Sequence, residues 1–91
     1  MKILDAEYHG YDYEGNKTIY TFNDTKQNII EIEKANVRSS SLIDMLENDI
    51  NEGKYFTLQI NTLKKPDGGV INMLMEAIEV KHDIYEFNDE E

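Results

Sequence analysis

Tyrosine, histidine and carboxylate side chains are interleaved in the segment EYHGYDYEG, residues 7–15. Asp5, Glu7 and His9 occupy every second position, so on a strand they share one face. Oxygen and nitrogen donors of this kind are possible ligands for a divalent cation. Alternate Cβ atoms along a strand are about 6.5–7 Å apart, however, so one strand does not close such a site unaided. We therefore expect a solvated polar face, with no metal and no cofactor.

The tyrosines offer a second kind of chemistry, because nucleobases stack on aromatic rings at roughly 1–3 kcal/mol per base. The carboxylates at positions 5, 7, 12 and 14 oppose it, since they repel a phosphate backbone. Rings that pack on the core, with hydroxyls toward water, are the structural alternative. A nucleic-acid face would consist of Tyr11, Tyr13, Tyr20, Tyr55, Lys64 and Lys65.

Signatures of catalysis are weak. His9 and His82 are the only histidines, and the serines at 39–41 are not part of a G-x-S-x-G turn. Gly68 and Gly69 are not followed by the Lys-Ser/Thr of a phosphate-binding loop. We expect no enzyme and assign no catalytic residue.

Acidic residues dominate the composition. Nineteen of them oppose nine basic residues, for a net charge of −10, and Arg38 is the only arginine. Such a surface repels nucleic acid and acidic membranes and attracts basic proteins. The chain has no cysteine, no apolar leader after Met1 and no run of 18 apolar residues. These absences predict a cytoplasmic protein without disulfides or a membrane span.

The carboxylates gather in two parts of the chain. No basic residue occurs from 39 to 53, where a helix is expected, and the second group lies toward the C-terminus. Carboxylates three residues apart on a helix stand about 5–6 Å apart, close to the roughly 6–7 Å between phosphates of one DNA strand. A solvated, solubilising surface is the alternative. The predicted partner-binding residues are Asp44, Glu47, Asp49, Glu52, Glu76, Glu79, Asp83 and Glu86.

Hydrophobic alternation predicts the strands. In residues 2–13 one face would carry Leu4, Ala6, Tyr8 and Gly10, with a bulge or bend at Gly10. Further strands are expected over 18–22, 29–34 and 55–63, joined by polar turns at 14–16 and 23–28.

Residues 70–81 are ambiguous, because MLMEAIE favours a helix by propensity. The turn at 64–69 and the alternation of Leu74, Glu76, Ile78 and Val80 favour a strand, which is our prediction. A short last strand is expected over 84–87.

The helix is expected to begin after Ser41, with Asp44 completing a capping box, and to end at Gly53. Its apolar stripe would consist of Leu42, Ile43, Met45, Leu46 and Ile50.

The fold class predicted is α+β: a small five-stranded antiparallel sheet, or an OB-like barrel, with one helix between strands 3 and 4. The order of elements over 2–81, with a long first strand bent at a glycine, resembles the OB-fold in topology. Residues 1–87 would form a single domain and 88–91 an acidic, frayed end.

The preferred function is a non-catalytic inhibitor that mimics nucleic acid and blocks the basic groove of a nucleic-acid-binding enzyme, without binding nucleic acid itself. In size and charge alone the chain resembles small phage-borne anti-restriction and anti-CRISPR proteins. Abundant Asn, Ile, Lys and Tyr also indicate an AT-rich genome, as in many phages and mobile elements. The alternatives are an OB-like accessory module that binds single-stranded nucleic acid or a replication partner, and a structural subunit that pairs through an edge strand, with a homodimer possible.

Overall fold

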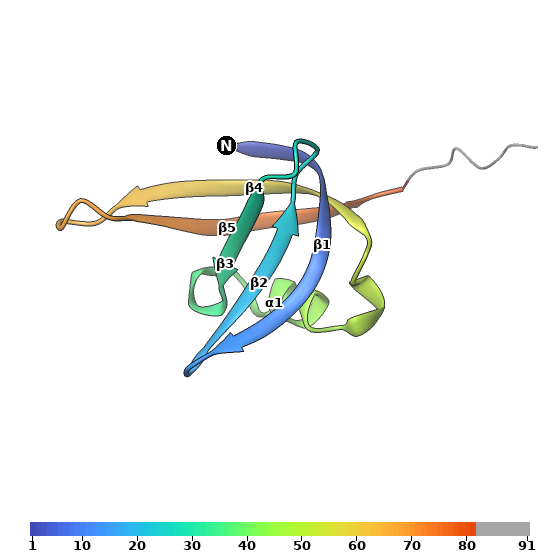
Figure 1. Cartoon of the computed structure of the whole chain (residues 1–91), viewed down its shortest axis with the longest axis horizontal. Coiled ribbons are helices and arrows are strands. Elements are labelled where there is room, and N and C mark those ends of the chain that lie inside the picture. Colours follow the sequence, from blue (N-terminus) through green and yellow to red (C-terminus); the bar gives the residue numbers. More distant parts are fainter. Residues whose placement is uncertain (82–91) are drawn as a thin grey trace, which may run out of the picture.

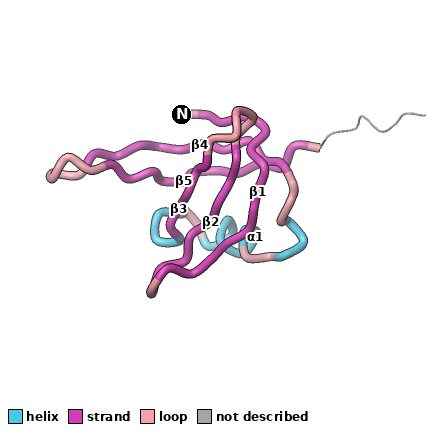
Figure 2. Tube along the Cα trace, viewed as in Figure 1, coloured by secondary structure: helices cyan, strands magenta, loops and turns pink. Residues whose placement is uncertain are grey.

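The computed structural model describes residues 1–81; the strand expected over 84–87 and the end segment 88–91 lie outside the described residues. Two short 3-10 turns flank the helix: η1 (Lys34–Asn36) and η2 (Asp49–Asn51). The main elements, labelled in Figure 1 and coloured by type in Figure 2, are β1 (Lys2–Glu14), β2 (Lys17–Asn23), β3 (Ile29–Glu33), α1 (Ser40–Leu46), β4 (Tyr55–Lys64) and β5 (Val70–Val80). The strand prediction for residues 70–81 is confirmed.

The five strands form one antiparallel sheet in the order β3-β2-β1-β4-β5, with α1 between β3 and β4. The α+β prediction is confirmed at this level, whereas closure into a barrel is not shown. The outer strands are β3 and β5. Among residues 1–81, backbone bonding to the outer edge of β5 comes from the segment between η1 and α1: Val37 forms a parallel bridge with Leu74, and the Arg38 N–H donates to the Leu74 carbonyl at 2.9 Å. The sheet is therefore open on most of that side.

Strand β1 bends between two partners. Its residues 2–7 pair with β4 and its residues 7–14 pair with β2, so the two halves of the sheet cross in Figure 1. The predicted bulge at Gly10 is confirmed by a register shift between Tyr8 and Tyr11 and by a φ of 91°. That φ is easily reached by glycine alone.

A second bulge in β1 overturns part of the predicted alternation. The pairing with β4 shifts between Ile3 and Ala6, and Asp5 has a φ of 54°. Because an extra residue reverses the inward and outward sides, Leu4 is 61% exposed and Ile3 packs against the core instead.

A third bulge does the same in β5. Ile60 is opposite Leu74 and Gln59 is opposite Glu76, which leaves Met75 unmatched. Leu74 is buried and Ala77 packs against the core, while Ile78 is 60% exposed. The prediction that Leu74 and Ile78 share a face is therefore wrong.

The helix begins earlier and ends sooner than predicted. Ser39, not Ser41, is the N-cap, because its hydroxyl accepts from the Leu42 N–H at 3.3 Å. The Asn51 side-chain amide donates to the Met45 carbonyl at 2.7 Å, which satisfies a carbonyl group at the end of the helix. Ile50 is consequently outside α1 and 69% exposed, and the stripe ends at Leu46.

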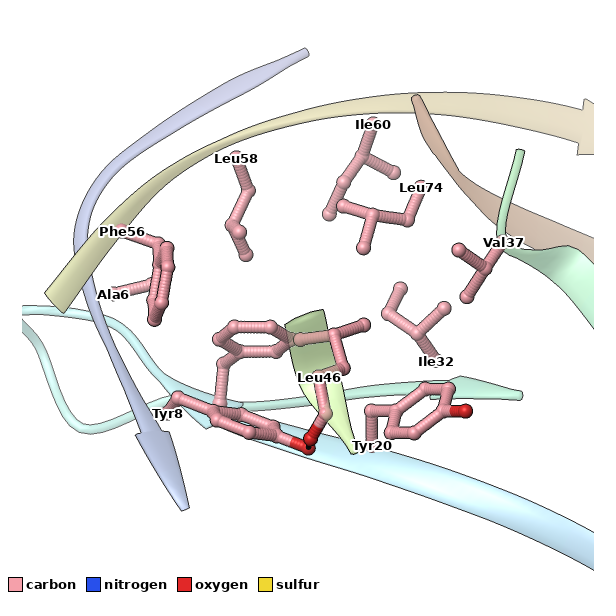
Figure 3. Packing of buried hydrophobic residues seen from close by; sticks show 11 residues of the cluster. Ala6, Tyr8, Tyr20, Ile32, Val37, Leu46, Phe56, Leu58, Ile60 and Leu74 are labelled. Carbon is pink, nitrogen blue, oxygen red and sulfur yellow. Dashed lines mark hydrogen bonds between the residues drawn. The ribbon is translucent and has the colours of Figure 1, made fainter. Parts of the chain in front are cut away.

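Every strand contributes to one core, drawn in Figure 3. Tyr8, Phe22 and Phe56 form an aromatic cluster, with ring centroids 4.9 Å apart for Tyr8–Phe22 and 6.4 Å for the other two pairs. Leu46 attaches α1 to this cluster, and its carbonyl accepts the Tyr8 hydroxyl at 2.7 Å. The buried cluster consists of Ala6, Tyr8, Tyr20, Phe22, Ile32, Val37, Leu46, Phe56, Leu58, Ile60 and Leu74.

Candidate functional site

Glu47, one of the predicted partner-binding residues, makes contacts within the fold. Its carboxylate accepts the Tyr20 hydroxyl at 2.6 Å and lies 3.0 Å from the Lys34 ammonium group. These two contacts, with the Tyr20 hydrogen bond first, lower the pKa of Glu47 below its ordinary value. Burial raises the pKa of Tyr20, and the hydrogen bond to Glu47 adds to the shift. Glu47 therefore connects α1 to β2 and η1.

Glu79 is also engaged, through an ion pair with Lys54 at 3.8 Å. Asp83 and Glu86 lie outside the described residues. The remaining predicted carboxylates are exposed and make no ion pair within residues 1–81: Asp44, Asp49, Glu52 and Glu76. These four carboxylates do not form one continuous row, because they lie in two separate regions of the surface.

The first region is the C-terminal half of β1, where η2 approaches the strand. The carboxyl carbon of Glu52 lies 3.0 Å from the position that a Cβ atom would take on Gly10. Asp49 is close enough to raise the pKa of Tyr11, an effect second to partial burial of the phenol. Tyr13 packs edge-on against Tyr11, with centroids 6.0 Å apart, and is 70% exposed. We call Tyr11, Tyr13, Asp49 and Glu52 the η2 face.

The second region is a groove of about 470 Å³ between the start of α1 and strand β5. Glu76 is part of its wall, and Asp44 lies three residues after another lining residue, Ser41, on the exposed side of α1. We call it the α1–β5 groove. Its lining residues are Arg38, Ser39, Ser41, Leu42, Met75, Glu76, Ala77 and Ile78.

The groove was not predicted from the sequence. The helix stripe predicts that Leu42 packs on the core, which it does, and alternation places Ile78 on the inner face of the strand. Leu42, Met75 and Ala77 also supply apolar lining, but Ile78 reaches the groove only because the bulge at Met75 turns it outward. No sequence signal marks that bulge.

The structure does not assemble the predicted nucleic-acid face. The inclusion of Tyr20 is wrong, because its ring is fully buried and faces the core. Tyr11 and Tyr13 lie on the β1–β2 hairpin, whereas Lys64 and Lys65 lie at the tip of the β4–β5 hairpin, which projects in another direction (Figure 1). Tyr55, at the start of β4, is 38% exposed. A base stacked on the first pair would not have the two lysines beside it.

On the expected polar face of β1, His9 Nε2 lies 3.6 Å from a carboxylate oxygen of Glu7, with both side chains well exposed. Among the described residues, no three histidine, aspartate or glutamate side chains are grouped as metal ligands would be. No helix within residues 1–81 has the length and apolar character needed to cross a bilayer.

No protein-family model matches the sequence, and no curated protein or solved structure shows significant similarity to the chain. Function therefore has to be inferred from the residues and their geometry.

Gly10 makes the position of Glu52 testable. Gly10→Ala is expected to lower the free energy of unfolding by about 1–2 kcal/mol for the positive φ alone, and by more because the new methyl group meets the Glu52 carboxylate. Urea denaturation measures the loss.

Gly68→Ala is the matched control, since Gly68 has nearly the same φ, 93°, but no atom within 4 Å of the added Cβ. Adding Glu52→Ala should reduce the Gly10→Ala penalty to that of Gly68→Ala. Equal penalties at both glycines in the parent chain would place the Glu52 side chain elsewhere.

Proposed function

We propose that this chain is a non-catalytic acidic protein that binds the basic, nucleic-acid-binding groove of another protein and blocks it. The observation that carries the proposal is the exposure of Asp44, Asp49, Glu52 and Glu76 without ion pairs in the described part of the chain. Carboxylates that are not neutralised within their own chain keep their charge available for a cationic partner, and they steer its approach over long range.

Local contacts support the proposal by fixing the backbone that carries these charges. The Asn48 side chain accepts the Ile50 N–H at 3.2 Å at the start of η2, and the Asn51 amide binds the end of α1. The link from Tyr20 to Glu47 holds the same connection against β2. A surface that is ordered before binding loses less conformational entropy when its partner arrives.

The kind of partner follows from the charge. A protein of net charge −10 is repelled by phosphates and attracted by the lysine- and arginine-lined groove of an enzyme that binds them. The small size, and an amino-acid composition that indicates an AT-rich genome, favour a phage or mobile-element inhibitor of the anti-restriction or anti-CRISPR type, acting in the cytoplasm.

One observation favours the alternative, an OB-like accessory module for single-stranded nucleic acid or a replication partner. The strand order, together with the bridge from Val37, which follows η1, to Leu74 on β5, fits a partly open OB-like barrel. The separation of Lys64 and Lys65 from the exposed tyrosines weighs against it, because single-strand binding needs a basic path beside the stacking rings.

The test is capture of basic proteins from a bacterial lysate by the immobilised chain. We expect nucleic-acid-binding proteins that duplex DNA displaces and that elute as salt is raised. Neutralising the exposed set (Asp44→Asn, Asp49→Asn, Glu52→Gln and Glu76→Gln) should weaken binding of a captured protein by roughly tenfold, from four exposed pairs at about 0.2–1 kcal/mol each.

The matched control neutralises four other exposed carboxylates, with the same change of net charge: Asp12→Asn, Glu14→Gln, Glu31→Gln and Asp67→Asn. It should bind nearly as well as the parent chain. If both variants weakened binding equally, the effect would depend on net charge alone. A labelled DNA strand shifted by the chain at physiological salt would reject the inhibitor and favour the accessory module.

A further inference from the structure

The outer edge of β5 is largely uncovered. On one side β5 pairs with β4 along its whole length. On the other side, within residues 1–81, the backbone is met only at Leu74, by the Val37 bridge and the Arg38 N–H. The chain then turns away, because the Ser39 cap starts α1 directly after Arg38. Residues 75–80 consequently have backbone groups along one edge that no described strand uses.

The α1–β5 groove runs along this edge. Leu42 supplies an apolar wall from α1, and Met75, Ala77 and Ile78 supply apolar surface from β5. Ile78 is 60% exposed. An exposed strand edge beside apolar pockets is the arrangement that extended peptides use when they add a strand to a sheet: main-chain hydrogen bonds give affinity, and alternate side chains fill the pockets.

Natural strand edges are often protected against such pairing by charged side chains, proline, bulges or a covering segment. Residues 75–80 begin at the Met75 bulge and contain no lysine or proline. Of their two charged side chains, Glu79 pairs with Lys54, and Glu76 makes no ion pair within residues 1–81. The groove beside them also contains Arg38. Two copies of this edge would bring these glutamates together between chains that each have a net charge of −10. Charge thus disfavours a second copy as the occupant and favours a basic segment.

We infer that the edge of β5 at residues 75–80 accepts an extended, basic segment of the partner protein as an additional strand. Apolar side chains of that segment lie on the inner side of the edge, toward Leu42 and Ala77. Its basic side chains lie on the outer face of β5, where their stems cover Ile78 and their charges reach Glu76. The inference rests on the proposed function for the charge of the partner, and it adds the way in which the partner is held.

The probe is a labelled, end-blocked peptide of about eight residues with alternating valine and lysine, a length typical of one strand. Fluorescence anisotropy with the full chain should show saturable binding that weakens with salt. The same peptide with an N-methyl group on every backbone amide keeps its charge but has no N–H group on either edge with which to form the ladder. It should bind about tenfold more weakly or worse, as expected for the loss of several hydrogen bonds.

Ile78→Lys should weaken binding of the unmodified peptide by a similar factor, because it places a protective lysine in the middle of the edge. Val70→Lys is the matched control: Val70 lies on the same strand, is 56% exposed and is outside the groove, and the charge change is identical. That control should change affinity far less. Amide hydrogen exchange should show new protection within residues 75–80 when the peptide is bound.

Equal binding of the two peptides would overturn the strand addition and leave the charge-based function standing. Absence of binding by the lysine peptide at low salt would also overturn it, whereas capture of basic proteins that ignores the four neutralised carboxylates would reject the proposed function itself. A dimer abolished by Ile78→Lys would assign the edge to a second copy. Residues 75–80 could instead be protected from hydrogen exchange in the free monomer and lose that protection when residues 82–91 are deleted. That result would assign the edge to the chain's own end. Either result overturns the inference.

Discussion

Phe56→Ala is expected to lower the free energy of unfolding by about 3–5 kcal/mol, the range measured for large-to-small changes at buried aromatic sites. Phe56 is 1% exposed, and its ring packs edge-on against Tyr8 and Phe22. It lies on β4, while its two aromatic partners come from β1 and β2. Removing the ring therefore leaves a cavity where the two halves of the bent sheet meet.

The size of the domain makes this loss severe. Domains of this length have a total stability of about 5–15 kcal/mol, and each kcal/mol shifts the melting temperature by about 4–8 °C. Thermal and urea unfolding followed by circular dichroism measure the change. Phe56→Leu should cost much less because it retains most of the apolar volume.

Leu63→Ala is the surface control. Leu63 is 48% exposed near the end of the β4–β5 hairpin, and its replacement should change stability by less than about 0.5 kcal/mol. A loss below about 1 kcal/mol for Phe56→Ala would contradict the central position of the aromatic cluster.

The sequence predicts the elements better than it predicts which side chains face inward. Alternation identifies all five strands, and it correctly places Ala6, Tyr8, Phe56, Leu58 and Ile60 in the core. It fails where a single residue is added to a strand, at Asp5 and Met75. Met75 gives no sign of a bulge by its type. Aspartate adopts a positive φ more readily than most residues, but it is a weaker signal than Gly10. The reversal at Leu4 and Ile78 is therefore seen only in the pairing with β4.

The helix shows a different limit. Three consecutive serines offer three possible caps, and local sequence does not choose among them. The structure selects Ser39 because Arg38 is held to Leu74, so the chain has to leave the sheet at that point. The end of α1 is likewise fixed by Asn51, six residues after the carbonyl that it binds.

The candidate site was predicted only in part for the same reason. A count of carboxylates in the sequence does not distinguish Glu47 from Asp49. In the structure, Glu47 is bound by Tyr20 and Lys34, whereas Asp49 is exposed. The difference arises because Tyr20 lies in the core with its hydroxyl directed at Glu47. Alternation is compatible with a buried ring at this position, but it does not identify the carboxylate that the hydroxyl meets. Long-range packing thus decides which of the acids are available to a partner.

Tyr20→Phe tests that link, and its effect is expected to depend on pH. The Tyr20 hydroxyl donates to a carboxylate at 2.6 Å, and a hydrogen bond to a charged group contributes about 1.5–3 kcal/mol. The lower end of that range is expected, because the Glu47 side chain is 31% exposed and water screens it. The loss should be measured by urea unfolding at near-neutral pH.

The sign of the pH dependence follows from Glu47. Its pKa is lower in the folded state than its ordinary value of 4.5, so the unfolded chain takes up a proton first as the pH falls. The stabilisation is complete above that ordinary value and is lost as the pH falls through the lowered pKa of the folded state. The Tyr20→Phe penalty should shrink over the same interval, and Glu47→Gln should remove this part of the pH dependence.

Tyr8→Phe is the matched control, since the Tyr8 hydroxyl is also buried but donates to the Leu46 carbonyl, which does not titrate. Its penalty should stay constant while that of Tyr20→Phe declines. A Tyr20→Phe penalty that is the same at neutral pH and well below the ordinary pKa of Glu47 would mean that the hydroxyl has another acceptor. Glu47 would then be held by Lys34 alone.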